Sequence, residues 1–149
     1  MTGTANTHEE LSPLKGSCLC GKVQYQIRGS LRSVRNCHCS MCRKFHGAAF
    51  RTRASVRTAD FAWISGAHLL TRYASSPGEV KTFCSVCGSN LVTYFEKAPD
   101  WLGFPLGTLD DDPGVKVTCH VFVGSKAPWH DITDDLPQWE TLPPERAAK

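Results

Sequence analysis

Alternating apolar and polar residues predict that this chain is built mainly from strands. Val23, Tyr25 and Ile27 alternate with polar neighbours, which is the period of a strand with one buried face. The longest such pattern covers 115–123, where four valines and Cys119 share the apolar face and His120 falls on the polar face. Further short strands are predicted within the segments AAFRTRA, HLLTRYA, VKTFC and NLVTYFE.

Helical periodicity is confined to two short segments, 40–46 and 132–136. Glycine and proline separate the predicted strands at SG, SPG, DDPG and KAP. The sequence therefore predicts a mainly β fold of short antiparallel strands with little helix.

The 149 residues suit a single domain. We predict a flexible leader over 1–14, a zinc-binding domain over 15–140, and an irregular tail over 141–149. No apolar run approaches the roughly 18 residues that a membrane span requires. The first residues carry no hydrophobic stretch typical of a secretory signal, so we expect a cytoplasmic protein without a membrane partner.

Eight cysteines carry the candidate chemistry, and seven of them lie in tight groups. The groups are the CLC pair (Cys18, Cys20), the CHCSMC triplet (Cys37, Cys39, Cys42) and the CSVC pair (Cys84, Cys87). Paired cysteines are typical of zinc sites, because one turn can direct two sulfurs at one ion, whereas disulfide frameworks scatter their cysteines. In a reducing compartment, thiols remain free to bind metal. We therefore predict zinc rather than disulfides.

The seven cysteines divide into a group of four and a group of three. The CLC and CSVC pairs together would form a closed structural site of four thiolates. Gly88 follows the CSVC pair and permits a left-handed turn, which would let backbone N–H groups reach the sulfurs. The alternative is that Cys37 and Cys39 pair with the CSVC cysteines and leave the CLC pair idle, and the spacing leaves this open.

The CHCSMC triplet would leave one coordination position of its zinc open, which is the mark of a catalytic site. His38 and His46 are alternative fourth ligands, although His38 lies between two ligands and its side chain is expected to point away. Cys119 is expected to be a small core residue rather than a ligand. We predict two zinc ions per chain, the second held less firmly because it has three protein ligands.

Charge is unevenly distributed around the triplet. The segment 28–57 contains eight basic residues and no acid. Three thiolates and one Zn²⁺ carry a net negative charge, so nearby cations would stabilise the site, lower thiol pKa values and attract an anionic substrate. The alternative is a solvated basic face with no function. Seven thiolates and two zinc ions would bring the formal charge of +3 to about zero, so we do not expect a nucleic-acid partner.

Four segments, GSCLCGKVQY, NCHCSMCRKFHGAAF, FCSVCGSNL and HVFVGSKAPW, together resemble the glutathione-dependent formaldehyde-activating enzyme family, which includes centromere protein V-like domains. The resemblance runs in order from Gly16 to about Trp139. It implies a β-tent fold, a structural zinc on the CLC and CSVC pairs, and a second zinc with an open position on the CHCSMC triplet. The namesake member adds formaldehyde to glutathione.

The resemblance thus implies a carbon–sulfur lyase or synthase acting on a small thiol adduct, with glutathione and an aldehyde as partners. His46 and His120 are the candidates for proton transfer. The alternative function is a non-catalytic, zinc-stabilised binding module for nucleic acid or protein, in which Phe45 and Phe50 could stack on bases. Those phenylalanines are expected to lie in the core instead.

Overall fold

The computed structural model describes residues 13–144, which form two sheets. The three-stranded sheet has the order β1–β2–β5 and comprises β1 (Leu14–Ser17), β2 (Gln24–Ile27) and β5 (Phe61–Ser65). The seven-stranded sheet has the order β10–β3–β4–β9–β8–β7–β6. Its strands are β3 (Arg32–Cys37), β4 (Arg51–Arg57), β6 (Leu70–Ser76), β7 (Glu79–Cys84), β8 (Asn90–Phe95), β9 (Trp101–Pro105) and β10 (Cys119–Val121). The mainly β prediction is confirmed.

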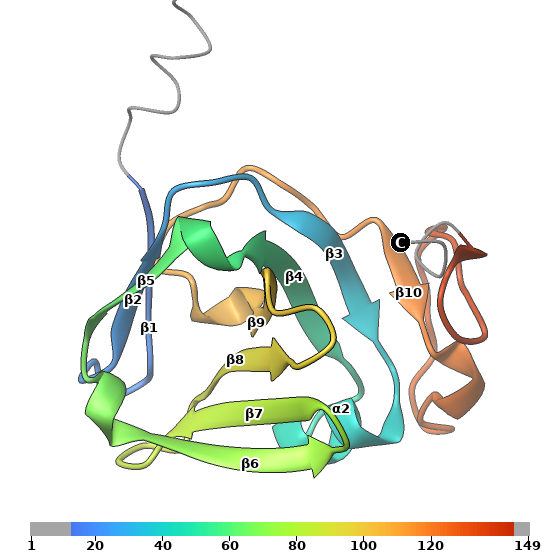
Figure 1. Ribbon diagram of the computed structural model, residues 1–149. Coiled ribbons are helices and arrows are strands. Elements are labelled where there is room, and N and C mark those ends of the chain that lie inside the picture. The colour runs from blue at the N-terminus through green and yellow to red at the C-terminus, as the bar shows by residue number, and fades with distance from the viewer. Residues whose placement is uncertain (1–12, 145–149) are drawn as a thin grey trace, which may run out of the picture.

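The larger sheet curves around the interior while the smaller sheet stands at one side of it (Figure 1). All strand pairs are antiparallel except β10 and β3, which run parallel at the edge of the larger sheet. The α-helix of the described chain, α2 (Ser40–His46), follows β3 directly and ends at Gly47, whose φ of 60° provides a left-handed cap. The predicted helix over 40–46 is therefore confirmed.

The main core lies between the two sheets. Val23, Tyr25 and Ile27 are buried, so the alternation in this part of the sequence marks the inward face of β2 as predicted. The ring of Tyr25 stacks on Phe61 at 5.1 Å and meets the edge of Phe104 at 6.0 Å, and its hydroxyl lies 2.6 Å from Thr108 Oγ1. Tyr25 therefore joins the two sheets by packing and by a hydrogen bond.

The predicted strand over 115–123 is wrong in its length. Only Cys119–Val121 form a strand, Gly114 has a left-handed φ of 73°, and Phe122 has a left-handed φ of 57° that ends the extended chain. The predicted faces are also wrong, because His120 is as deeply buried as Val121. The segment around Pro137–Trp139 pairs with the outer edge of β10 through backbone hydrogen bonds to His120, so β10 is not an exposed edge strand.

The predicted helix over 132–136 is wrong as well, because this segment is irregular. The Asp134 carboxylate accepts a hydrogen bond from the backbone N–H of Leu136 at 3.0 Å. Such a local side-chain contact competes with the backbone hydrogen bonds of a helix.

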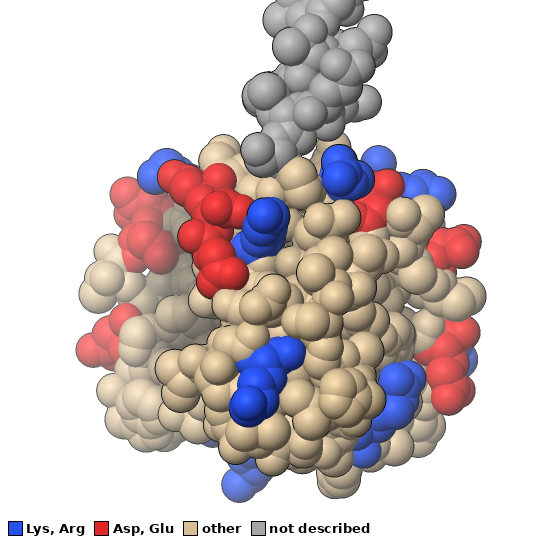
Figure 2. All heavy atoms as spheres, turned by 90° about the vertical axis from the view of Figure 1, so that its left-hand side faces the viewer, with Lys and Arg blue, Asp and Glu red and all other residues tan. Residues whose placement is uncertain are grey.

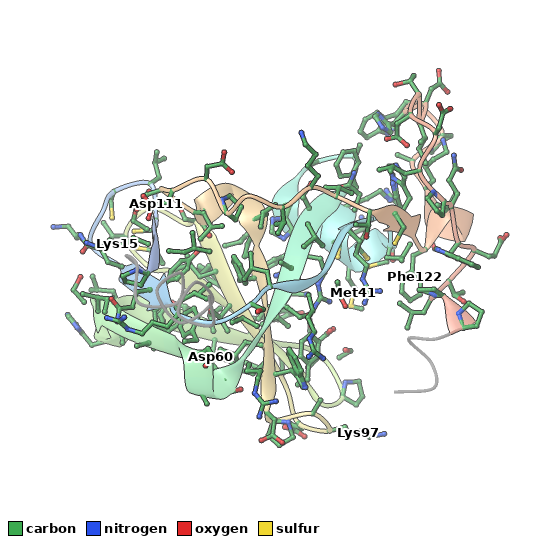
Figure 3. All side chains as sticks on the ribbon, turned by 90° about the horizontal axis from the view of Figure 1, so that it is seen from above. Lys15, Met41, Asp60, Lys97, Asp111 and Phe122 are labelled. Carbon is green, nitrogen blue, oxygen red and sulfur yellow. The ribbon has the colours of Figure 1, made fainter. Side chains whose placement is uncertain are left out.

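The predicted leader over 1–14 and tail over 141–149 lie largely outside the described residues. At the start of the described chain, Lys15 on β1 donates its backbone N–H to Asp111 at 2.8 Å (Figure 3). Within residues 13–144, no helix has the length and apolar character needed to cross a membrane.

Substitution of Gly16 tests the packing between the sheets. A Cβ at Gly16 would overlap the ring of Tyr25, whereas a Cβ at Gly107 would meet nothing within 4 Å. We expect Gly16→Ala to lower the free energy of unfolding by about 1–3 kcal/mol, measured by chemical denaturation, because this core has no room to yield. Gly107→Ala is the matched control and should change stability little. Equal effects of the two substitutions would contradict this description of the core.

Candidate metal centres

Four sulfurs from distant parts of the sequence meet between the two sheets. Cys18 and Cys20 lie in the β1–β2 turn, and Cys84 and Cys87 lie at the end of β7 and in the turn that follows. Their Sγ atoms all lie within 4.8 Å of one another, a group we call the four-cysteine cluster. The structure thus brings together the CLC and CSVC pairs and not the alternative pairing. The cluster ties the smaller sheet to the larger one.

Two similar turns hold these sulfurs. Gly21 and Gly88 adopt left-handed φ values of 81° and 82°, so the left-handed turn predicted at Gly88 is confirmed. The N–H of Gly88 bonds to the Cys84 carbonyl at 2.8 Å rather than to a sulfur. The sulfur of Cys84 instead accepts a hydrogen bond from the Val86 N–H at 3.4 Å. The turns therefore direct backbone N–H groups at the sulfurs, although not from the glycine.

The CHCSMC triplet forms a second group, the three-cysteine cluster, at the junction of β3 and α2. Cys37 ends β3, Cys39 caps the N-terminus of α2 by accepting the Cys42 N–H at 3.3 Å, and Cys42 lies in the helix. The three Sγ atoms lie within 4.8 Å of one another, and Cys37 and Cys42 are buried. Because strand, cap and helix follow without a break, six residues present three sulfurs to one point.

The three thiols are strongly coupled. Hydrogen bonds from the thiols of Cys37 and Cys42 lower the pKa of Cys39 to about 2, and the same contacts raise the pKa of Cys37. The three-cysteine cluster therefore already favours negative charge on one sulfur at neutral pH, which suits a cation.

No other His, Cys, Asp or Glu of residues 13–144 joins the three-cysteine cluster within the same 4.8 Å limit. Cys119 packs against the buried group of Cys37, Cys42 and Val121 without joining the three-cysteine cluster, and it is half-buried. The His38 side chain hydrogen-bonds elsewhere, as the sequence indicated.

The hydrogen bonds of His46 fix its tautomer. Asn90 Nδ2 donates to the Phe45 carbonyl at 3.1 Å, and this carbonyl can only accept, so the amide orientation is set. The same Nδ2 lies 2.9 Å from His46 Nδ1, which must then accept. Burial lowers the pKa of His46 to about 4, so the ring is neutral with its hydrogen on Nε2. That nitrogen is buried with no hydrogen-bond partner among the described residues.

His120, expected on the polar face of a strand, instead lies in a buried hydrogen-bond chain beside the triplet. Its Nε2 donates to the Asp134 carboxylate at 3.0 Å, and its Nδ1 lies 2.9 Å from His38 Nε2. The hydrogen bond from His120 lowers the pKa of Asp134, and burial lowers the pKa of His38 to about 4. Because both nitrogens of His120 are occupied, it is a poor candidate for proton transfer to a substrate.

The basic segment is divided between solvent and interior: Arg28, Arg32, Lys44 and Arg57 are exposed, whereas Arg35 and Arg51 are buried. Arg51 and Arg35 are each 4% exposed, and Lys81 from β7 is 3% exposed. Burial lowers the pKa of Arg51, while the thiols of Cys42 and Cys37 act in the opposite direction. The face that carries β1, β2 and β5 shows both acidic and basic side chains (Figure 2). Phe45 and Phe50 are half-buried, packing against Phe83 and His38 respectively.

Asn90, Lys81 and Asp134 were missed by the sequence analysis. Each lies far along the chain from the group it contacts, and although Asn90 falls within the FCSVCGSNL segment, nothing in that segment indicates a contact with His46. Only the fold brings Asn90 to His46, and only the segment that pairs with β10 brings Asp134 to His120.

The donor sets fit zinc. Thiolate sulfur is the ligand that Zn²⁺ prefers in structural sites, and four sulfurs form a closed set while three leave room for another ligand. Fold and site together therefore define a mainly β protein with two cysteine clusters that could hold metal ions.

Comparison with known proteins identifies the family. Residues 13–125 match the sequence model of the glutathione-dependent formaldehyde-activating enzyme family, so the chain belongs to that family. A protein of Halomonas elongata, provisionally named a glutathione-dependent formaldehyde-activating enzyme, is 30% identical over 127 residues, covering 80% of each chain. A crystal structure of a Rhodobacter sphaeroides protein superposes with a TM-score of 0.54 at 28% identity, covering 68% of this chain and 90% of that one.

Removal of His120 tests the buried hydrogen-bond chain. We expect His120→Leu to lower the free energy of unfolding by about 1–3 kcal/mol, because His38 Nε2 would lose its partner in the interior. His130→Leu is the control, since it removes a ring contact with Phe50 at 5.5 Å rather than this hydrogen bond. Chemical denaturation measures both variants. If His130→Leu is destabilised as much as His120→Leu, the hydrogen bond between His120 and His38 does not explain the loss of stability.

Proposed function

We propose that this protein is a zinc-dependent carbon–sulfur lyase that reversibly joins a small thiol to an aldehyde, as in the formation of S-(hydroxymethyl)glutathione. Family membership supports glutathione and formaldehyde as the partners. The observation that carries the proposal is the three-cysteine cluster, in which three sulfurs converge and no fourth protein ligand of the described chain joins them.

Under this proposal the two clusters have different tasks. Cys18, Cys20, Cys84 and Cys87 hold a structural zinc, and Cys37, Cys39 and Cys42 hold the catalytic zinc. A zinc ion bound by three thiolates supplies a Lewis-acid position at which a thiol can be deprotonated or a carbonyl oxygen polarised. The nearby Arg51 guanidinium would offset the negative charge of the sulfurs, and Cys42 and Cys37 in turn act to raise the pKa of Arg51 against the effect of burial.

The reaction needs no further reactant. The thiol sulfur forms a bond to the carbonyl carbon, the C=O π electrons move to oxygen, and the thiol proton ends on that oxygen. His46 is the better placed of the two histidines to stabilise the negative charge that develops on this oxygen. Its Nε2–H is unpartnered and buried, whereas both nitrogens of His120 are engaged. His46 Nε2–H would donate to the carbonyl oxygen, and Asn90 would hold the ring in position.

Metal analysis tests the two tasks. We expect about two zinc ions per chain in the intact protein and about one in Cys39→Ser, which should remain folded. Cys87→Ser should lose its fold, because the four-cysteine cluster ties the two sheets together. Cys119→Ser is the control and should keep both ions. Elemental analysis with circular dichroism measures each case, and loss of both ions from Cys39→Ser in a folded protein would contradict the assignment.

Exchange spectroscopy tests the reaction. With zinc-loaded protein, glutathione and formaldehyde, we expect two-dimensional NMR exchange between free and adduct signals to be faster than in the uncatalysed mixture. His46→Ala should lower this rate by about 10²-fold while zinc content stays the same, because removal of one donor to a developing oxyanion costs this much. His68→Ala, at an exposed histidine, is the control. An exchange rate equal to that of the mixture without protein would refute the proposed function.

A further inference from the structure

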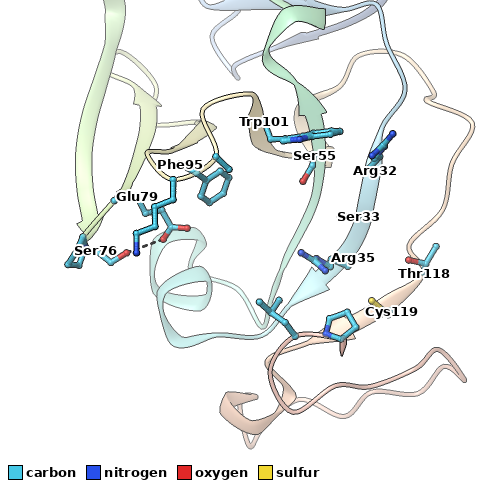
Figure 4. Close-up of a pocket in the computed structure, with 16 residues that line it drawn as sticks. Arg32, Ser33, Arg35, Ser55, Ser76, Glu79, Phe95, Trp101, Thr118 and Cys119 are labelled. Atoms are coloured by element: carbon cyan, nitrogen blue, oxygen red, sulfur yellow. Dashed lines mark hydrogen bonds between the residues drawn. The ribbon is translucent and has the colours of Figure 1, made fainter. Parts of the chain in front are cut away.

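A cleft with a volume of about 880 Å³ opens beside the three-cysteine cluster. Its walls are β3 and β4, the β6–β7 and β8–β9 turns, and the chain near Leu142 (Figure 4). The charged lining residues are Arg32, Arg35, Lys97 and Glu79, so cations outnumber acids. Glu79 already accepts a hydrogen bond from Ser76 at 3.3 Å.

A bulge in β3 directs two of these arginines to the same side. Arg32 and Arg35 are three residues apart, so in a regular strand they would point to opposite faces. The register with β4 shifts between them, and Ser33 has a left-handed φ of 53°. A bulge can redirect a side chain in this way, and strained residues of this kind gather at functional sites. Both arginines consequently line the cleft.

The wall behind the cleft adds positive charge. Arg53 donates to Ser55, a lining residue, at 2.9 Å, and its Nε is buried without a hydrogen-bond partner among the described residues. Burial and the guanidinium groups of Arg51 and Arg35 lower the pKa of Arg53 to about 9. Such a concentration of guanidinium groups favours an anion, and the planar fork of arginine matches a carboxylate best.

The three-cysteine cluster lies next to the cleft along β3, although none of its three cysteines lines the cleft. Arg35 precedes Cys37 by two residues in regular pairing with β4, so the two share a face and lie about 7 Å apart along the strand. Cys119 lies opposite Arg35 in the β10–β3 pair, lines the cleft, and packs against the buried group formed by Cys37, Cys42 and Val121. On the other side, the Arg32 guanidinium lies 5.0 Å from the ring of Trp101, which fixes the outer wall.

We propose that this cleft binds the carboxylate groups of the thiol substrate, with Arg35 holding the carboxylate nearer the sulfur and Arg32 the one farther out. The inference rests on the proposed function and identifies the residues that would hold the carboxylates of a thiol substrate such as glutathione. Arg32 and Arg35 position the substrate and take no part in bond formation.

Binding of S-methylglutathione tests the cleft separately from the chemistry, because this ligand has both carboxylates and no free thiol. We expect Arg32→Gln to weaken its binding to the zinc-loaded protein about tenfold, measured by isothermal titration calorimetry. Arg35→Lys keeps the positive charge but loses the planar guanidinium that can bind a carboxylate through two hydrogen bonds, so it should weaken binding of S-methylglutathione as well. Arg28→Gln, at an exposed arginine outside the cleft, is the matched control and should bind as the parent protein does.

Esterification provides the second comparison. The diethyl ester of S-methylglutathione should bind the parent protein weakly and should not distinguish it from Arg32→Gln. The cleft assignment would be overturned if the parent protein bound S-methylglutathione and its diethyl ester with equal affinity, or if it did not bind S-methylglutathione at all. It would also be overturned if Arg32→Gln bound S-methylglutathione as tightly as the parent protein does. If the parent protein catalyses the exchange but Arg32→Gln binds S-methylglutathione unchanged, the proposed function is retained and the cleft assignment is rejected. If the parent protein binds S-methylglutathione through its carboxylates but does not catalyse the exchange, the cleft assignment is retained and the proposed function is rejected.

Discussion

The convergence of four sulfurs between the two sheets is the constraint on which the structure depends. Cys18 and Cys20 come from the smaller sheet, and Cys84 and Cys87 come from the larger one, more than sixty residues along the chain. Closing so long a loop is entropically unfavourable, so an ion bound by these sulfurs would contribute to folding itself. With the sheets held together, β3 and α2 are free to present a second set of sulfurs for chemistry.

The second set differs from the first in its number of ligands and its surroundings. Three sulfurs converge where buried cations from β4 and β7 gather, and the cleft beside them carries more positive than negative charge. Such charges are unfavourable in a protein interior unless something compensates them. Thiolates would do so at the cluster, and the proposed substrate carboxylates would lie beside the arginines of the cleft. One electrostatic arrangement would therefore serve both the proposed metal ion and the proposed anionic substrate.

The sequence predicted what depends on local pattern. The burial of β2, the helix over 40–46 and the grouping of cysteines follow from residue spacing within a few positions. It did not predict β9, because the glycine and proline in this strand are residues that usually argue against a central strand. It also did not predict the burial of His120, which depends on the segment near Trp139 that pairs with β10. The cleft was also missed, because the bulge at Ser33 reverses the side-chain alternation on which strand predictions rely.

A crystal structure of the zinc-loaded protein, with anomalous diffraction recorded at the zinc edge, tests the central claim most directly. The account predicts two peaks, one bound by four sulfurs between the sheets and one bound by three sulfurs and a ligand that is not part of the protein. Disulfides in place of either peak, or a protein side chain completing the three-sulfur site, would contradict it.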